Sequence, residues 1–350
     1  MKNYTGLLPY FFVNCAGWNG EGEEAVLEAL KAVGFRFRFS DYDEMKWEES
    51  LRQTMNDALC VGVVSVIDPS YQYRENAATE LIMAAICQKP VIALVFDQAI
   101  LPERALHLLK EATVIKAARE DASYIRTLAE TAPFADCLTL SPIVAGPDFE
   151  IDSDVLVKYH GASETVTVPE GIAVIGASAF SKNMTVTEIV LPASVRRIDE
   201  RAFSNCCFLR RIEIGEGVEE IGYAAFWNCR KLESITLPET ALSLGTHLFF
   251  WCYRLESAKL PEGLREIPEG TFVECTALKR FEFSQNLISI GRSAFMGCSH
   301  LAAAFLPKGL QTIGKEAFSG CRGMVIATVF KGCAYEKDAF PPQVTVRVQA

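Results

Sequence analysis

The sequence lacks the features that would place it in several large functional classes. No stretch of 18 apolar residues occurs among its 350 residues, so we expect no membrane-spanning helix. It contains no C-x-x-C pair, and its four histidines lie far apart along the chain. Because zinc and iron sites need clustered Cys and His ligands, no metal site is predicted.

Basic residues are scarce in the first part of the chain. Residues 1–150 contain 13 Lys and Arg against 22 Asp and Glu, whereas residues 151–350 contain 21 against 22. Nucleic acids and anionic membranes attract clustered Lys and Arg, so we expect neither as a partner. The apolar stretch 6–13 has only one preceding lysine and no good cleavage site, which favours a strand over an export signal. We therefore expect a cytoplasmic protein.

From Ile175 to Met324 the sequence repeats every 23 residues. Four positions of the repeat keep their residue type, and they form the columns Ile175, Ile198, Ile221, Leu244, Ile267, Ile290, Ile313; Phe180, Phe203, Phe226, Phe249, Phe272, Phe295, Phe318; Cys206, Cys229, Cys252, Cys275, Cys298, Cys321; and Leu209, Leu232, Leu255, Leu278, Leu301, Met324. A fixed period of this length predicts a solenoid whose repeats stack to bury one continuous core.

The repeat also predicts where strands and thiols lie. Segments 235–238 and 258–261 should be parallel strands, one from each repeat, and each ends at a proline. Six of the 12 cysteines occupy one inward column, where a small apolar side chain suits a packed interior. This predicts buried, reduced thiols and not a disulfide framework.

Residues 7–137 alternate between continuous apolar runs and helical patterns. Strands are expected at 10–14, 35–39, 60–67, 90–96 and 113–115, with helices between them. Val and Ile runs separated by helices are typical of a parallel sheet covered on both faces. We expect an α/β domain with a flavodoxin-like doubly wound sheet, in which ligands bind beyond the carboxyl ends of the strands.

A segment without periodicity separates the two patterns. Residues 138–148 contain two prolines and a glycine, which is typical of a linker. The predicted organisation is an α/β domain at 1–137, a linker at 138–148, and a solenoid with terminal caps at 149–350.

Three loops should lie at the ligand edge of the predicted sheet, at 14–22, 40–47 and 68–81. The first contains three glycines, which either bring backbone amides to a phosphate or form a plain tight turn, and it lacks the dinucleotide motif G-x-G-x-x-G. The third leads into a helix carrying Glu80, whose helical neighbours are Met83, Ala84 and Cys87. A carboxylate on an apolar stripe suits action on a ligand, although the helix dipole alone also favours carboxylates there.

The repeat IGYAAFWNCRKLESITLPET at 221–240 resembles the BspA-like leucine-rich repeat family. The resemblance covers roughly residues 149–330 and implies a right-handed solenoid. It also implies recognition of an unknown protein or surface ligand and does not imply catalysis.

The first 137 residues resemble a bacterial TIR (Toll/interleukin-1 receptor) domain. The resemblance rests on Trp47 after an acidic loop and on the segments YFFVN at 10–14, ALKAVGFRFRF at 29–39 and ENAATELIMAAICQKPVIALVF at 75–96. Enzymatic members split NAD⁺ at the nicotinamide–ribose bond with a glutamate early in the third helix, and that glutamate falls on Glu80. The resemblance therefore implies NAD⁺ as a substrate, no separate cofactor, and homotypic contacts with other TIR domains.

The same resemblance gives candidate residues for the substrate pocket, namely Asn14, Trp18, Ser40, Trp47 and Asn76. The segment also resembles the nucleoside deoxyribosyltransferase fold, which uses a carboxylate at the same place. Both kinds of enzyme cleave an N-glycosidic bond through an oxocarbenium-like centre that a carboxylate stabilises.

Other functions stay open at this point. A response-regulator receiver would explain Asp68 and Lys116, but Asn14-Cys15 stands where that fold needs an acidic pair for Mg²⁺. A non-catalytic interaction protein is favoured by Ala77, which replaces the cysteine that many TIR enzymes have before the glutamate. A bare recognition module with an inactive front domain is the third alternative.

Overall fold

The chain divides into two compact units, Met1–Pro142 and Ile143–Ala350, and the division falls within the segment expected to be a linker. Among the described residues, no helix has both the length and the apolar character needed to cross a bilayer. The computed structural model describes residues 5–7, 10–15, 30–31, 35–38, 47–67, 77–96, 99, 109–117, 123–131 and 146–350.

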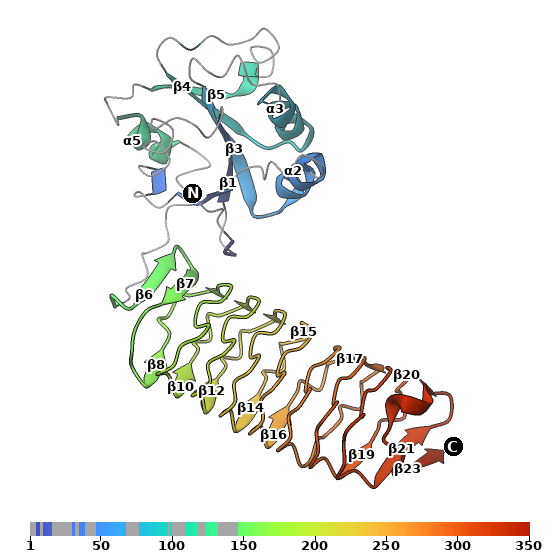
Figure 1. Cartoon of the computed structure of the whole chain (residues 1–350). Helices are drawn as coiled ribbons and strands as arrows, with labels where there is room; N and C mark the ends of the chain where they lie inside the picture. Colours follow the sequence, from blue (N-terminus) through green and yellow to red (C-terminus); the bar gives the residue numbers. More distant parts are fainter. Residues whose placement is uncertain are drawn as a thin grey trace. The chain divides into compact units, whose positions relative to one another are not determined.

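The N-terminal unit contains a five-stranded sheet in which every neighbouring pair of strands is parallel. Its strand order is β2-β1-β3-β4-β5 (Figure 1). The strands are β1 Tyr10–Cys15, β2 Phe37–Arg38, β3 Cys60–Ile67, β4 Val91–Phe96 and β5 Thr113–Ala117.

Strands β1, β3 and β4 are buried on both faces, which explains their continuous apolar runs, whereas the edge strand β5 exposes Val114 and Lys116 on one face. The described helical elements are α2 Trp47–Asn56, α3 Ala77–Ile86, η2 Leu109–Glu111 and α5 Ser123–Glu130. Val64 and Val66 of β3 pack in one cluster with Leu128 of α5. Ile67 is one position from Val66 and therefore points to the opposite face, where it packs with Leu81 of α3. The helix expected between the strands at 10–14 and 35–39 lies mostly outside the described residues.

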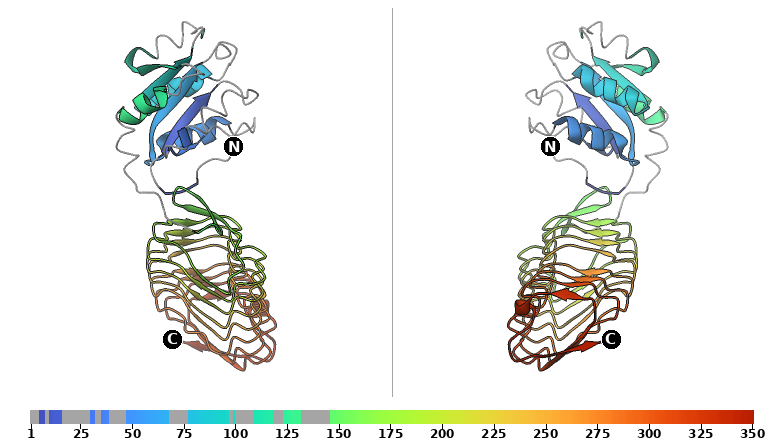
Figure 2. Two further views of the ribbon diagram at one scale, coloured as in Figure 1. Left: turned by 90° about the vertical axis from the view of Figure 1, so that its left-hand side faces the viewer. Right: turned by 90° about the vertical axis from the view of Figure 1, so that its right-hand side faces the viewer.

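The second unit is a solenoid that begins with an antiparallel hairpin, β6 Phe149–Asp152 and β7 Val155–Tyr159. Most of the following coils add short parallel strands at a step of 23 residues, so that Glu188 pairs with Arg211 and Ile198 with Ile221. Figure 2 shows the coils stacked one upon another. Strands β14 Ser234–Thr236 and β16 Ser257–Lys259 confirm the expected parallel pair in segments 235–238 and 258–261.

These strands form two columns along the solenoid. The first column consists of β8 Thr165–Thr167, β10 Glu188–Val190, β12 Arg211–Glu213, β14 Ser234–Thr236, β16 Ser257–Lys259, β19 Ala303–Phe305, β21 Ile326–Phe330 and β23 Thr345–Gln349. The second consists of β9 Val174–Ile175, β11 Arg197–Ile198, β13 Glu220–Ile221, β15 Ser243–Leu244, β17 Glu266–Ile267, β18 Ser289–Ile290, β20 Thr312–Ile313 and β22 Ala334–Tyr335. The 3₁₀ turn η3, Lys337–Ala339, lies between β22 and β23.

A proline interrupts the second column between β15 and β17, which belong to different sheets. The residue after the column's Ile normally donates its N–H to the preceding coil, as Gly245 does to the Ile221 oxygen at 2.7 Å and Gly291 to the Ile267 oxygen at 2.7 Å. Pro268 occupies this position in its coil and has no N–H to donate. The sheet is therefore broken at this coil.

A ladder of stacked aromatic rings runs through the solenoid core. Neighbouring ring centroids lie 5.1–5.4 Å apart along Tyr159, Phe180, Phe203, Phe226, Phe249, Phe272, Phe295, Phe318 and Phe340. The seven phenylalanines of the sequence column are all fully buried, as predicted. Tyr159 and Phe340 extend the ladder at its two ends, 21 and 22 residues from their neighbours, and therefore escape a search at a fixed step.

The cysteine column forms a second ladder beside the rings. Each thiol lies 3.1–3.3 Å from the carbonyl oxygen of the phenylalanine 26 residues earlier, so the thiol donates to the preceding coil. These six cysteines are fully buried, as predicted, and all six are free thiols. Each carbonyl already accepts a backbone N–H, as the Phe203 oxygen does from Cys206, so the thiol adds a second hydrogen bond that joins neighbouring coils.

We predict that Phe249→Ala lowers the free energy of unfolding of the solenoid by about 3–5 kcal/mol, because it removes a central ring and leaves a cavity. Guanidinium titration of the full chain, followed by circular dichroism, measures the change. Phe305, whose side chain is 68% exposed, provides the control, and Phe305→Ala should change stability by less than about 0.5 kcal/mol. Equal effects of the two variants would contradict the role of the ladder.

The thiols also predict a pH dependence. Burial raises the pKa of Cys206 and Cys321 to about 12, and that of Cys275 well above 9.0. Thiols of the unfolded chain ionise from about pH 9 while the folded ones stay protonated, so stability is complete below that pH and is lost as the pH rises further.

Cys275→Ala should therefore reduce the alkaline slope of the unfolding free energy by about 1.4 kcal/mol per pH unit. Denaturant titrations under reducing conditions between pH 8 and pH 11 measure this slope. Met324→Ala removes a buried side chain without a thiol and should retain the original slope. An unchanged slope in Cys275→Ala would contradict the prediction.

Candidate functional site

Glu80 lies in the first turn of α3 and is fully buried. Of the three helical neighbours expected to form an apolar stripe with it, Ala84 is buried, whereas Met83 and Cys87 are only half-buried. Leu81, the next residue, packs with Ile67 of β3 and Ala93 of β4. In the crossover from β3 to β4, the connecting helix begins near the edge where β3 ends. The carboxylate thus combines exclusion from water with a position at the positive end of a helix.

A buried hydroxyl faces the same side of the sheet. Ser65 of β3 is fully buried and alternates with Val64 and Val66, which point toward the α5 side. Its Oγ has no hydrogen-bond partner within the described part of the chain. Asn14 of β1 is its register partner. Ser65 is not among the residues expected at the site, although a single serine within the apolar run CVGVVSVI could have indicated it.

The structure describes only some of the other candidate pocket residues. Asn14 lies near the end of β1 and Trp47 begins α2, but the side chains of both lie outside the described residues. Trp18, Ser40 and Asn76 fall wholly outside them. Within the described part of the chain, no group of three His, Cys, Asp or Glu side chains is placed to hold a metal ion.

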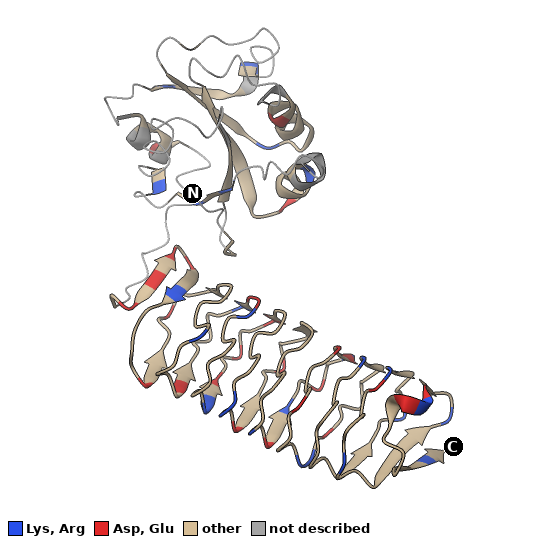
Figure 3. Cartoon of the chain, viewed as in Figure 1, with Lys and Arg blue, Asp and Glu red and all other residues tan. Residues whose placement is uncertain are grey.

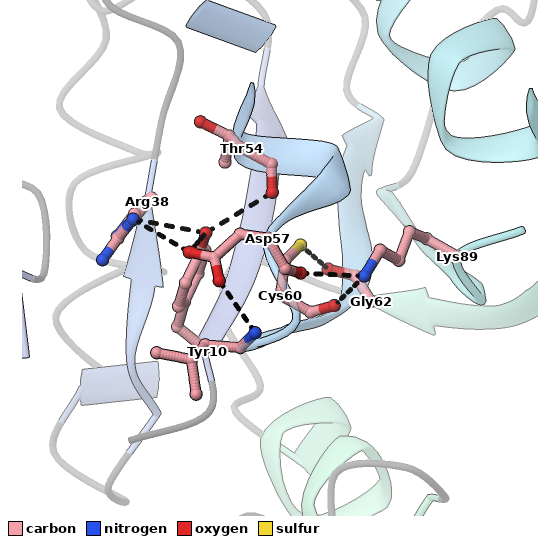
Figure 4. Close-up of polar contacts among 8 residues, drawn as sticks. Tyr10, Arg38, Thr54, Asp57, Cys60, Gly62 and Lys89 are labelled. Atoms are coloured by element: carbon pink, nitrogen blue, oxygen red, sulfur yellow. Dashed lines mark hydrogen bonds and ion pairs between the residues drawn. The ribbon is translucent and has the colours of Figure 1, made fainter. Parts of the chain in front are cut away.

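A polar network occupies the opposite edge of the sheet, where the strands begin (Figure 4). Tyr10 donates its hydroxyl to Asp57 Oδ2 at 2.7 Å, and the Arg38 guanidinium lies 4.1 Å from the Tyr10 ring centroid. Arg38 also pairs with Asp57 at 3.4 Å, and Lys89 Nζ donates to the Cys60 carbonyl at 2.6 Å. Burial and the bond to Asp57 raise the pKa of Tyr10 above its ordinary value.

This network joins the first residues of β1 and β3 to the segment before β4. Its side chains bond to one another and to backbone carbonyls, which indicates a structural role. It also lies away from the edge where Glu80 stands. No local pattern in the sequence indicates this network, because its bonded partners lie up to 47 residues apart.

On the solenoid, charged residues of both signs are interspersed along the coils (Figure 3). A groove of about 640 Å³ lies where β12 and β14 are neighbours without pairing in one sheet. Its charged lining consists of Glu188, Arg210, Arg211, Glu213, Glu216 and Glu233. Arg211 and Glu213 pair at 2.9 Å, so the remaining lining carries more negative than positive charge.

The solved structures that are similar to this chain include several leucine-rich repeat proteins. The leucine-rich repeat protein of T. pallidum is 25% identical, with 57% of this chain and 91% of that chain covered and a TM-score of 0.39. A leucine-rich repeat protein from Bacteroides ovatus is 22% identical, with 60% and 67% covered and a TM-score of 0.32. One from Bacteroides capillosus is 24% identical, with 34% and 98% covered and a TM-score of 0.30. No curated protein matches the chain.

The profile of the BspA type leucine rich repeat region matches residues 150–248 and 198–325, with six copies of the repeat. The two matches together span half of the chain and coincide with the stacked coils described above. The chain therefore belongs to the BspA-type leucine-rich repeat family.

Proposed function

We propose that the solenoid is a recognition module that binds a basic segment of a partner protein in the groove between β12 and β14. The observation that carries this proposal is the groove itself, a hollow of about 640 Å³. A frame held by ring stacking and backbone hydrogen bonds loses little conformational freedom on binding, which favours affinity.

The charge of the groove indicates the partner's chemistry. Four glutamates and two arginines line it, and one arginine is already paired with a glutamate. A segment carrying Lys or Arg would therefore be attracted, whereas an acidic segment would be repelled. The outward strand position also varies between coils, from Glu213 to Thr236, Lys259 and Phe305, so each stretch of the surface has its own chemistry.

A photo-crosslinking residue at Thr236, on the groove, should trap one partner in the producing cells, whereas the same residue at Lys308 should not. With that partner purified, Glu233→Arg should weaken binding by about tenfold, since it reverses a charge that attracts the basic segment. Glu282→Arg makes the same change at an exposed position outside the groove and should leave affinity unchanged. Equal crosslinking from both positions, or equal loss in both variants, would contradict the proposal.

For the N-terminal unit we propose a TIR-like domain that cleaves NAD⁺ at the nicotinamide–ribose bond. Two observations support the proposal. The parallel sheet has the strand order 2-1-3-4-5, which is the flavodoxin-like order. Glu80, the residue that matches the family's glutamate, is fully buried in the first turn of α3.

The proposed chemistry uses Glu80 as the group that stabilises charge. As nicotinamide leaves with the bonding electron pair, positive charge develops on the ribose carbon and its ring oxygen, and water then adds to that carbon. A carboxylate shielded from water stabilises this charge more strongly than an exposed one does. Asn14, Trp18, Ser40, Trp47 and Asn76 are proposed to line the substrate pocket. The reaction requires no further cofactor, and the cytoplasm supplies its substrate.

A non-catalytic role is the second candidate for this unit. Ala77, the first residue of α3, stands where many TIR enzymes have a cysteine, which favours this alternative. In that role the unit would contact other TIR domains, and the chain would link such an assembly to the target of the solenoid.

Nicotinamide release by the purified full chain, measured at increasing protein concentration, separates these two candidates. Glu80→Gln keeps the shape of the side chain and should lower the rate by about 100-fold or more, because the stabilising charge is lost. Asp57→Asn removes a carboxylate at the opposite edge of the sheet and should retain the rate. Activity that survives in Glu80→Gln would contradict the role of Glu80, and no release at any concentration would select the non-catalytic role.

A further inference from the structure

A second hollow on the solenoid has a charge opposite to that of the groove. It measures about 440 Å³ and lies among the turns of the first coils. Three cations line it, Lys158, Lys182 and Arg201, and none of its lining residues is an Asp or Glu. Residues 151–350 contain 21 Lys and Arg against 22 Asp and Glu, so the excess of positive charge is local to this hollow.

These cations remain available to a ligand. Lys158 Nζ donates to the Ser178 carbonyl at 2.9 Å, which uses one of its three protons. The Arg201 guanidinium lies 5.3 Å from the Tyr223 ring centroid and 5.8 Å from that of Trp227, which orients it without neutralising it. Within the described part of the chain, none of the three cations forms an ion pair.

The floor of the hollow is a fixed polar network. Ser204 is only 3% exposed, and its Oγ lies 3.4 Å from Ser181 Oγ. Asn205 Nδ2 donates to Ser204 Oγ at 3.1 Å, while Asn205 Oδ1 accepts from Asn228 at 2.8 Å. The hydroxyls and amide are therefore held in place before any ligand arrives, which reduces the entropy lost on binding.

The backbone at this site adopts a conformation that its residues do not favour. Lys182 has φ 63° and Arg201 has φ 53°, both in the left-handed region where glycine is the unstrained choice. Other coils place Ser178, Ala224, His247, Gly270, Ser293 and Glu316 in the column of Arg201, and Asn205, Asn228, Trp251, Glu274, Gly297 and Gly320 in that of Lys182, all at positive φ. The left-handed conformation therefore belongs to every coil, and the two cations that neighbouring coils carry at these positions distinguish this hollow.

An aromatic wall completes the hollow. Trp227 lines it with a half-buried indole, whose Nε1 has no hydrogen-bond partner among the described residues. Trp251 continues the aromatic surface, with its ring centroid 6.1 Å from that of Trp227 and 37% of its surface exposed. Sugar rings present apolar C–H faces to such indoles and hydroxyls to serine and asparagine. We propose that this hollow binds an anionic saccharide, a sugar that carries a sulfate, phosphate or carboxylate group.

The cations and the indole of this hollow have different roles in the proposed binding. Lys182 and Arg201, with Lys158, bind the anionic group through charge-assisted hydrogen bonds. The serines and Asn205 bind sugar hydroxyls, and Trp227 packs against the ring. A volume of about 440 Å³ is in the range of small-molecule sites and suits one or two sugar rings more than an extended peptide.

Calorimetric titration of the full chain with N-acetylglucosamine 6-sulfate tests this site. We expect a Kd of about 1 mM or tighter, weakening as salt screens the charges. Unsulfated N-acetylglucosamine should bind at least about tenfold more weakly, because its contact with the cations is missing. Absence of binding by the sulfated sugar, equal affinity for the uncharged one, or tighter binding of a phosphoserine peptide would overturn the proposal.

Arg201→Gly and Lys182→Gly should each weaken binding of the sulfated sugar by about tenfold. Both replacements place glycine at positive φ, so they relieve strain and should leave the fold intact. Ser293→Gly, at φ 52° in the same column as Arg201, controls for the backbone change, and Lys308→Ser controls for net charge. Unchanged affinity in Arg201→Gly, or an equal loss in either control, would overturn the assignment of the cations.

Trp227→Leu separates a saccharide site from a simple anion site. It should weaken the sulfated sugar while leaving the affinity for inorganic sulfate unchanged, because sulfate does not contact the indole. If inorganic sulfate binds as tightly as the sulfated sugar in the unsubstituted chain, the saccharide part of the proposal is wrong. Circular dichroism of each variant confirms that the solenoid is folded.

Discussion

Stacking of one aromatic ring on the next is the interaction on which the solenoid depends. Each ring is covered above and below by rings of the neighbouring coils, with centroids 5.1–5.4 Å apart, so no coil can bury its own ring alone. The cysteine ladder and the short strands add hydrogen bonds across the same interface between coils. All three interactions join residues about one repeat apart, and this explains why the sequence keeps a step of 23 residues so strictly.

That strictness determines how much of the fold is predictable. The four columns indicate the core of the solenoid directly, because the same neighbour recurs in every coil. A search for residues 23 positions apart fails where the spacing changes, as at Tyr159 and Phe340, which continue the ladder at spacings of 21 and 22 residues. It also misses Pro268, whose missing N–H interrupts one sheet while the ladder of rings continues past it from Phe249 to Phe272.

The N-terminal unit is less predictable because its important contacts are not periodic. Continuous apolar runs indicate a buried sheet, and the described strands lie close to the expected segments. Glu80 and Ala84 are buried, whereas Met83 and Cys87 of the expected stripe are only half-buried. That stripe also cannot reveal Ser65, which comes from a strand some 15 residues earlier. The network of Tyr10, Arg38 and Asp57 is likewise assembled from three separate elements, and no local pattern in the sequence connects them.

A regular frame also separates structural positions from functional ones. Inward columns barely change, because each must fit the coil on either side. The two left-handed positions of each coil are free to vary, since one column carries Arg201, Ala224, His247, Gly270 and Glu316 and the other carries Lys182, Asn205, Trp251, Glu274 and Gly297. Glycine is the lower-energy residue at positive φ, yet most coils carry other residues there, so the stack does not determine the side chain. Neighbouring coils can therefore place Lys182 and Arg201 beside one hollow without changing the stack, and this freedom is what a binding site on a regular frame requires.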